Sequence, residues 1–198
     1  MLKKLSSVTV ALLVINVAVF LLTMNWDSRL MLALFPPSSE LFLPFQILSH
    51  FFMHGNSAHL LFNMFGLYMF GSVLEQIWGA KLFLLFYLLC ALGAAALQFL
   101  VWRTGLADPV PILGASGAIY GVFVGFAMLF PNHRIMLIIP PIPMKAKYMI
   151  AGLIVFDVTL GVSGAASGIA HFAHLGGAIV GAVYVLWWKK KTNFRFQP

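Results

Sequence analysis

The chain has 198 residues, of which 62% are hydrophobic and 9% are charged, and its mean hydropathy is +0.97. So few charges cannot cover the surface of a soluble domain, which excludes a water-soluble protein. The net charge of +7 does not indicate a nucleic-acid partner, because the basic residues lie between and beyond long apolar runs. The single cysteine, Cys90, excludes an internal disulfide and a cysteine-based metal cluster, and we interpret it as a buried bystander.

The apolar runs predict an all-α polytopic membrane protein, because a bilayer core has no water to pair with exposed backbone groups. We expect one domain over residues 1–198 with six spanning helices, at about 7–24, 56–78, 80–102, 116–130, 146–162 and 169–188. The start MLKK resembles that of a signal peptide, but no cleavage site of small residues follows, so we expect the first helix to be retained. The proline-rich, aromatic loop before the second helix is expected to lie in the membrane interface.

The distribution of basic residues predicts the orientation in the membrane. If the N-terminus is cytoplasmic, the segments on that side carry ten basic residues and the outer segments carry two, Arg29 and Arg103. The ten are Lys3, Lys4, Lys81, Arg134, Lys145, Lys147, Lys189, Lys190, Lys191 and Arg195. Because such an excess marks the inner side, we expect both termini in the cytoplasm, and we expect a prokaryotic plasma membrane.

The fourth predicted helix, 116–130, is unusually short for a spanning helix. At 1.5 Å per residue it extends roughly 22 Å, whereas the hydrocarbon core is roughly 30 Å thick. A helix that ends at the inner face therefore begins with Ser116 below the outer surface, where its free N–H groups would stabilise an anion. His174 in the sixth helix, and His59 and Asn63 in the second, reach a similar depth from the outer side. Intramembrane polar residues usually face a protein interior or a cavity.

Three motifs lie on the second, fourth and sixth predicted helices: HLLFN at 59–63, GASGAIYG at 114–121 and AHLGGAIVG at 173–181. Together, and in this order, they resemble the rhomboid family of intramembrane serine proteases. The resemblance extends over nearly the whole chain, and it implies a bundle of six helices with a short central fourth helix. It implies a serine–histidine dyad, with Ser116 as the nucleophile and His174 as the general base. It also implies that His59, Asn63 and the backbone N–H of Ser116 bind the oxyanion.

Further residues are expected to support this site. The resemblance implies that Gly114 makes the tight turn before the serine and that Tyr120 packs against the ring of the base. Gly117 and Gly177 lie on small-residue ridges that predict close packing of the fourth and sixth helices. The resemblance implies no metal or organic cofactor.

The resemblance also bears on the substrate. It implies that the substrates are membrane proteins cut within a transmembrane segment near the outer membrane face, and it leaves the oligomeric state open. It points to the loop 163–168 and the fifth helix as a lid and gate. As a hypothesis, the backbone near 111–115 and 163–168 pairs with an unwound substrate strand.

Other readings of the same residues stay open. Ser116 could be a helix-packing residue of a non-catalytic rhomboid-like protein that binds membrane helices, although such relatives lack the serine or the base. His171, one turn before His174, is the alternative base. Asp157 in the fifth helix either orients a histidine, as the third member of a triad would, or makes a structural hydrogen bond. The family uses no third member.

Two further functions have weaker support. The spacing of His50 with His54, and of His171 with His174, suits zinc, but no carboxylate or cysteine accompanies either pair. The resemblance implies that His54 is a structural residue instead. A small transporter would favour an internal repeat and broken helices at the membrane midplane, and the sequence has no such repeat.

Overall fold

The computed structural model describes residues 7–24, 30–106, 108–136, 142–164 and 170–193. Its helices are α1 (Ser7–Leu22), α3 (Gln46–Ser49), η1 (His50–Phe52), α4 (Ser57–Gly66), η2 (Leu67–Gly71), α5 (Ser72–Trp78), α6 (Ala80–Thr104), α7 (Ser116–Leu129), α8 (Ala146–Ser163) and α9 (His171–Thr192). The segments α4, η2 and α5 form one continuous helix whose middle part is π-helical. An antiparallel pair of short strands, β1 (Arg134–Met136) and β2 (Pro143–Lys145), lies between α7 and α8 in the chain, and the sequence analysis did not anticipate it.

The lengths of the helices bear out a membrane fold. Four helices are long and apolar enough to cross a bilayer, namely Ser57–Trp78, α6, α8 and α9. Helices α1 and α7 are apolar but shorter, with 16 and 14 residues. The prediction of an all-α polytopic membrane protein is therefore confirmed. The count of six spans stays a prediction, because α1 and α7 fall below the length of a typical spanning helix.

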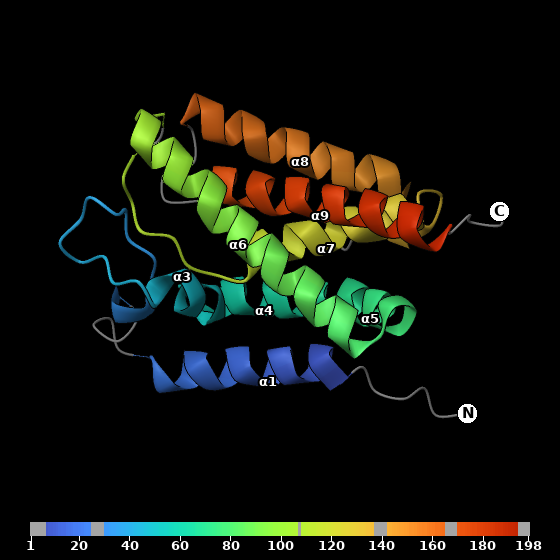
Figure 1. The fold of residues 1–198 in the computed structure, drawn as a ribbon, viewed down its shortest axis with the longest axis horizontal. Coiled ribbons are helices and arrows are strands. Elements are labelled where there is room, and N and C mark those ends of the chain that lie inside the picture. The colour runs from blue at the N-terminus through green and yellow to red at the C-terminus, as the bar shows by residue number, and fades with distance from the viewer. Residues whose placement is uncertain (1–6, 25–29, 107, 137–141, 165–169, 194–198) are drawn as a thin grey trace.

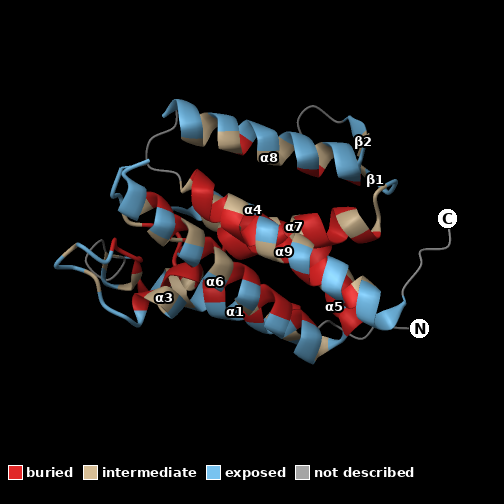
Figure 2. Ribbon diagram, turned by 45° about the horizontal axis from the view of Figure 1, so that its top comes forward, coloured by how far each residue is buried: buried red, intermediate tan, exposed pale blue. Residues whose placement is uncertain are grey.

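Helix α7 lies at the centre of the bundle, with α9 beside it, α6 crossing over it and the α4–α5 helix between it and α1 (Figure 1). Ten of its 14 residues are buried. By contrast, α8 lies at the edge and buries only Ala146, Ile150 and Asp157 (Figure 2). The short helix is thus surrounded by protein, which is the environment that the loop leading to Ser116 requires inside a membrane.

Helices α7, α9 and α6 approach one another at glycine backbones. A Cβ on Gly177 of α9 would overlap the carbonyl oxygen of Gly117 in α7, and a Cβ on Gly121 would overlap Sγ of Cys90 in α6. In lipid, helices associate through such close packing rather than through a hydrophobic driving force. The small-residue ridges of the fourth and sixth predicted helices are therefore in contact, and Cys90 is buried against them.

Polar contacts fix the helix ends that lie away from Ser116. Glu75 in α5 accepts hydrogen bonds from the backbone N–H groups of Val8 and Thr9, at 2.9 and 2.7 Å, and so caps α1. Lys189 in α9 donates through Nζ to the carbonyl oxygen of Met128 at 2.7 Å, in the last turn of α7. A cation at a helix C-terminus pairs with the unsatisfied carbonyls there. Helix α7 is thus held by α9 along its glycine ridge and at its end.

Replacing Gly177 by alanine is expected to destabilise the protein, because the new methyl group would overlap the backbone of Gly117, which cannot move aside. Overpacking of this kind costs about 1–3 kcal/mol, so the midpoint of thermal unfolding in detergent should fall by several degrees. The matched control is Gly152→Ala in α8, where a Cβ meets nothing within 4 Å. That variant should keep or raise the midpoint, since alanine favours helix over glycine. Equal midpoints for the two variants would contradict the close contact.

Candidate active site

Ser116 opens α7 directly after a turn that favours glycine. Gly114 has φ +115°, a backbone conformation that residues with a Cβ rarely adopt. Its N–H donates to the carbonyl oxygen of His50 at 2.9 Å, which fixes the turn. No side chain caps the helix at Ala115, so the free N–H groups of the first turn remain available next to Ser116. The turn expected at Gly114 is therefore present.

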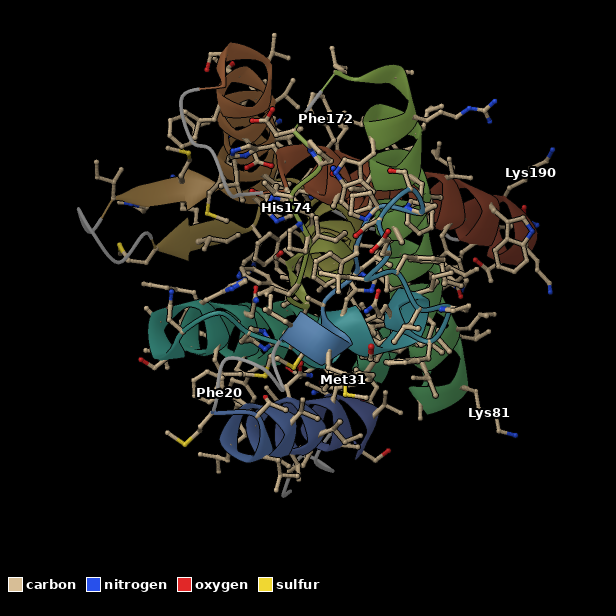
Figure 3. The ribbon with its side chains drawn as sticks, turned by 90° about the vertical axis from the view of Figure 1, so that its left-hand side faces the viewer. Phe20, Met31, Lys81, Phe172, His174 and Lys190 are labelled. Atoms are coloured by element: carbon tan, nitrogen blue, oxygen red, sulfur yellow. The ribbon has the colours of Figure 1, made fainter. Side chains whose placement is uncertain are left out.

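His174 lies in the first turn of α9 and reaches the serine. Its Nε2 lies 2.7 Å from Oγ of Ser116, and its side chain is buried. Tyr120, one turn into α7, stacks on the imidazole with ring centroids 4.3 Å apart and planes 8° apart. Figure 3 shows His174 close to the middle of the bundle. The structure thus brings together the three residues of the fourth and sixth helices that the motifs singled out.

A carboxylate of α8 forms hydrogen bonds with two histidines of α9. Oδ2 of Asp157 lies 2.9 Å from Nδ1 of His174, and Oδ1 lies 2.7 Å from Nδ1 of His171. All three residues are buried. His171, the alternative base, is therefore turned toward Asp157, and the ring beside the Ser116 hydroxyl is that of His174. Both contacts of Asp157 are with histidines, and one of these is the histidine beside the serine.

His59 and Asn63 lie beside the turn that leads to Ser116. A Cβ on Gly114 would come within 2.7 Å of Cε1 of His59 and 3.6 Å of Nδ2 of Asn63, so the glycine leaves room for both side chains. Nδ2 of Asn63 is buried, and no described residue accepts a hydrogen bond from it. Asn56 caps α4 by accepting the backbone N–H of His59 at 2.8 Å. This cap is not among the predictions made from the sequence, although an asparagine just before an apolar helical run is a typical start signal.

Two further histidines pack near this site, in the segment before α4. His54 is fully buried, and its ring meets that of His59 edge-on with centroids 5.1 Å apart. Nδ1 of His50 lies 2.8 Å from the carbonyl oxygen of Gln46. Burial lowers the pKa of His50 and of His54 to about 4, because a charged imidazole is disfavoured away from water. Both rings are therefore neutral at pH 7.

The expectation that no carboxylate accompanies either histidine pair is wrong. A carboxylate does accompany one histidine pair, because ligand atoms of Asp157, His171 and His174 all lie within 4.8 Å of one another. These three residues are the group that could hold a metal ion among those that the structure describes. Their contacts of 2.7 and 2.9 Å are of hydrogen-bond length, so the carboxylate and the two rings already satisfy one another directly.

A small cavity lies beside Ser116 and His174. Its volume is about 20 Å³, and its lining includes His50, Leu113 and Ala173. A cavity of this size has room for roughly one water molecule. Among the described residues, the free space beside Ser116 is too small for a segment of polypeptide.

Two residues of the loop near 111–115, which is expected to pair with a substrate strand, already have backbone partners within the chain, and the pairing stays a prediction. Both backbone groups of Ile112 are bonded to Leu34, at 2.8 and 2.9 Å, and the N–H of Gly114 is bonded to His50. No short-range signal indicates the pairing with Leu34, which lies far away in the sequence. The expected lid at 163–168 lies mostly outside the described residues, which here end at Gly164.

Comparison with known proteins identifies related chains. The family model described as Rhomboid domain matches residues 43–191. Rhomboid protein 1, mitochondrial, of Saccharomyces cerevisiae is 33% identical over 141 residues, which cover 70% of this chain and 40% of that protein. Rhomboid protease AarA of Providencia stuartii is 28% identical, with 66% and 51% covered. RHOMBOID-like protein 12, mitochondrial, of Arabidopsis thaliana is 30% identical, with 96% and 60% covered.

In this helical membrane bundle, the half-buried Ser116 at the start of a short central helix thus lies in contact with the buried His174. The chain belongs to the rhomboid family, whose members include intramembrane serine proteases. It spans between 40% and 60% of the length of the three relatives named above. It is an integral, multi-pass membrane protein. Because two of these relatives carry mitochondrial names, the expected prokaryotic plasma membrane is not supported.

Thermal stability in detergent should fall as the pH decreases from about 6.5 to about 4. Because the pKa values of His50 and His54 are lowered in the folded chain, the unfolded chain binds protons in this range that the folded chain does not. The stabilisation is fully present above the ordinary histidine pKa of 6.5 and is lost on the acid side of it. The measurement is the unfolding midpoint as a function of pH.

Matched variants assign this effect. His54→Gln should flatten the pH dependence, even if it lowers the midpoint, because one of the two titrating rings is gone. Asn132→Gln, at an exposed position, changes no titratable group and should leave the dependence unchanged. A wild-type midpoint that stays constant between about pH 7 and about pH 4.5 would contradict the assignment.

Proposed function

We propose that the chain is an intramembrane serine endopeptidase that cleaves transmembrane segments of other membrane proteins through Ser116 and His174. The observation that carries the proposal is the 2.7 Å contact between Oγ of the half-buried Ser116 and Nε2 of the buried His174. A serine hydroxyl is a weak nucleophile on its own and becomes effective when an adjacent base takes its proton. Plain helix packing would not require a base aimed at the hydroxyl with Tyr120 stacked on its ring.

The first chemical step forms an acyl-enzyme. Oγ of Ser116 bonds to the carbonyl carbon of the scissile peptide while its proton moves to Nε2 of His174, and the carbonyl electron pair moves to the oxygen. His174 then gives this proton to the leaving nitrogen, and the C–N bond breaks. A water molecule, activated by His174 in the same way, hydrolyses the ester and restores the serine. The cavity beside both residues has room for one such water.

The negatively charged oxygen of the intermediate needs donors that are already in place. Three candidates surround the turn before α7: the backbone N–H of Ser116, the amide of Asn63 and the ring of His59. Preorganised donors of this kind stabilise the transition state because they need no reorganisation during the reaction. The buried amide of Asn63, which donates to no described residue, supports this assignment.

Admission of a substrate helix is proposed to involve α8. This helix buries three residues, and Val155 and Phe156 on it are 65% and 63% exposed, so lipid rather than protein surrounds most of it. A segment held by so few contacts can separate from the bundle at small cost. The substrate must also unwind near the cut, because the amides of an intact helix are shielded.

The orientation is proposed from the distribution of charge. Ser116 lies at one end of α7, whereas Lys189, Lys190 and Lys191 lie in the last turn of α9, beside the other end of α7. Under the positive-inside rule the lysine-rich end faces the cytoplasm or its equivalent, and the site opens toward the opposite face. Of the other expected inner residues, Lys3, Lys4 and Arg195 lie outside the described residues.

The first test is labelling with a fluorescent fluorophosphonate, which bonds covalently to activated serines. The purified protein in detergent should be labelled, and Ser116→Ala and His174→Ala should not, because they lack the nucleophile and the base. Ser38→Ala and His133→Ala are matched controls at exposed positions and should be labelled like the wild type. If the folded wild type is neither labelled nor able to cleave a transmembrane segment, the protease proposal is wrong. The alternative, a non-catalytic protein that binds membrane helices, would then replace it.

Asn63→Ala should lower the rate without removing the nucleophile. Loss of one oxyanion donor typically costs about 10²–10³-fold in kcat, so cleavage of a transmembrane segment should slow by this factor while fluorophosphonate still labels Ser116. Asn132→Ala removes an amide from an exposed position and serves as the control. Cleavage by Asn63→Ala at the wild-type rate would show that the buried amide has no part in the reaction.

A further inference from the structure

Asp157 is a buried carboxylate on a helix that mostly faces outward. It is 6% exposed, and of the three buried residues of α8 it is the charged one. A carboxylate inside a membrane bundle is strongly disfavoured unless donors surround it. Its donors are Nδ1 of His174 at 2.9 Å and Nδ1 of His171 at 2.7 Å. The hydroxyl of Tyr120 also lies close enough to interact with it.

We infer that Asp157 is a positioning residue for His174, so that the chain carries a Ser116–His174–Asp157 triad rather than a dyad. His171 holds the second oxygen of the carboxylate. This inference rests on the proposed protease function. It adds that Asp157 determines which nitrogen of His174 carries the proton. It departs from the dyad that the family resemblance implied.

The direction of the hydrogen bonds carries the inference. An ionised carboxylate can only accept, so in a neutral His174 the proton sits on Nδ1, and Nε2 keeps its lone pair. Nε2 is the nitrogen that lies 2.7 Å from Oγ of Ser116. In the opposite tautomer Nε2 would carry a proton and could not accept the one from the serine. Asp157 therefore selects the form of His174 that can act as a base.

The charge of Asp157 also matters once the proton has moved. When Nε2 takes the proton from Ser116, the ring of His174 becomes an imidazolium, with both nitrogens protonated. The carboxylate that accepts from Nδ1 stabilises this cation, and it does so more strongly in a buried site than in water. The Nδ1 proton stays on the ring, and Asp157 stays ionised throughout.

Two other contacts limit how far these groups can rotate. Tyr120 stacks on the ring of His174 and fixes its plane. His171 binds Oδ1 of Asp157, so the carboxylate cannot turn its second oxygen toward His174 without losing a partner. Partners of this outer kind fix the orientation of a reactive side chain without touching the substrate.

The decisive variant is Asp157→Asn, which keeps the size of the side chain but exchanges one acceptor oxygen for a donor. In the full chain in detergent, the maximal rate of fluorophosphonate labelling should fall about 10²–10⁴-fold. The reagent concentration at half-maximal rate should change little, because the residue does not touch the reagent. Asp108→Asn makes the same chemical change at an exposed position and should keep the wild-type rate. A wild-type maximal rate for folded Asp157→Asn would overturn the inference.

A double-mutant comparison tests the part assigned to His171. His171→Phe should lower the labelling rate by about 10–100-fold, the range known for residues that orient metal-bound histidines through a hydrogen bond. In the Asp157→Asn background it should have no further effect, because His171 acts through Asp157. Independent, multiplicative losses would overturn the role of His171.

A measurement on the wild type decides the inference even if Asp157→Asn does not fold. In ¹⁵N NMR of histidine-labelled protein at about pH 9, where imidazoles are neutral, His174 should carry its proton on Nδ1. The resonance is assigned by its absence in His174→Ala. Protonation on Nε2 would overturn the inference. The two proposals fail in different experiments. If the protease function is wrong, the wild type shows no Ser116-dependent labelling, and this result does not depend on the tautomer of His174.

Discussion

The close approach of α7 and α9 is the contact on which the rest of the structure depends. Gly117 and Gly177 allow the two backbones to meet, and this brings His174 within 2.7 Å of Ser116. Because lipid provides no hydrophobic force between helices, the packing itself must hold them together. Helix α9 also holds the far end of α7 through Lys189. The fold and the site therefore share one interface, and a change in the packing would displace His174 as well.

The buried carboxylates also hold helices together, because each needs hydrogen-bond donors that a neighbouring helix supplies. Among the described residues, the buried carboxylates are Glu75 and Asp157, and each accepts hydrogen bonds from N–H groups of another helix. Glu75 uses backbone donors and so fixes the start of α1. Asp157 uses imidazole donors and so fixes the ring beside Ser116. Each carboxylate therefore connects two helices, α5 with α1 in the case of Glu75 and α8 with α9 in the case of Asp157.

The sequence was sufficient for the residues whose relation is set along a helix. Ser116 and Tyr120 lie one turn apart, and the glycine ridges follow from a four-residue spacing, so their placement did not need the fold. His174 could be assigned because its motif matched that of a family. The predictions for Ser116, Tyr120 and the glycine ridges depend on the spacing of residues along one helix, which can be read directly from a single sequence.

The contacts that were missed depend on how separate segments meet. Helix α8 is apolar on all sides, so no periodicity indicates that the face with Asp157 turns toward α9. The pairing of Leu34 with Ile112 joins two loops, and the strands β1 and β2 have three residues each, too few to give an alternating pattern. The expectation that no carboxylate accompanies a histidine pair was wrong for the same reason. Asp157 lies 14 residues from His171 in the sequence but contacts it in the fold.

The cavity beside Ser116 has a consequence for selectivity. With about 20 Å³ of free volume, the resting protein can hold the water that hydrolysis consumes but not the chain that hydrolysis cuts. Under the proposed function, the chain in this state does not cut the helices that diffuse past it in the bilayer. Discrimination then takes place before any peptide bond meets the serine, at the step that decides which neighbouring helix can displace part of the bundle and unwind. Under the proposed function, substrate choice would then depend on how readily the substrate helix unwinds as well as on the residues around its cleavage site.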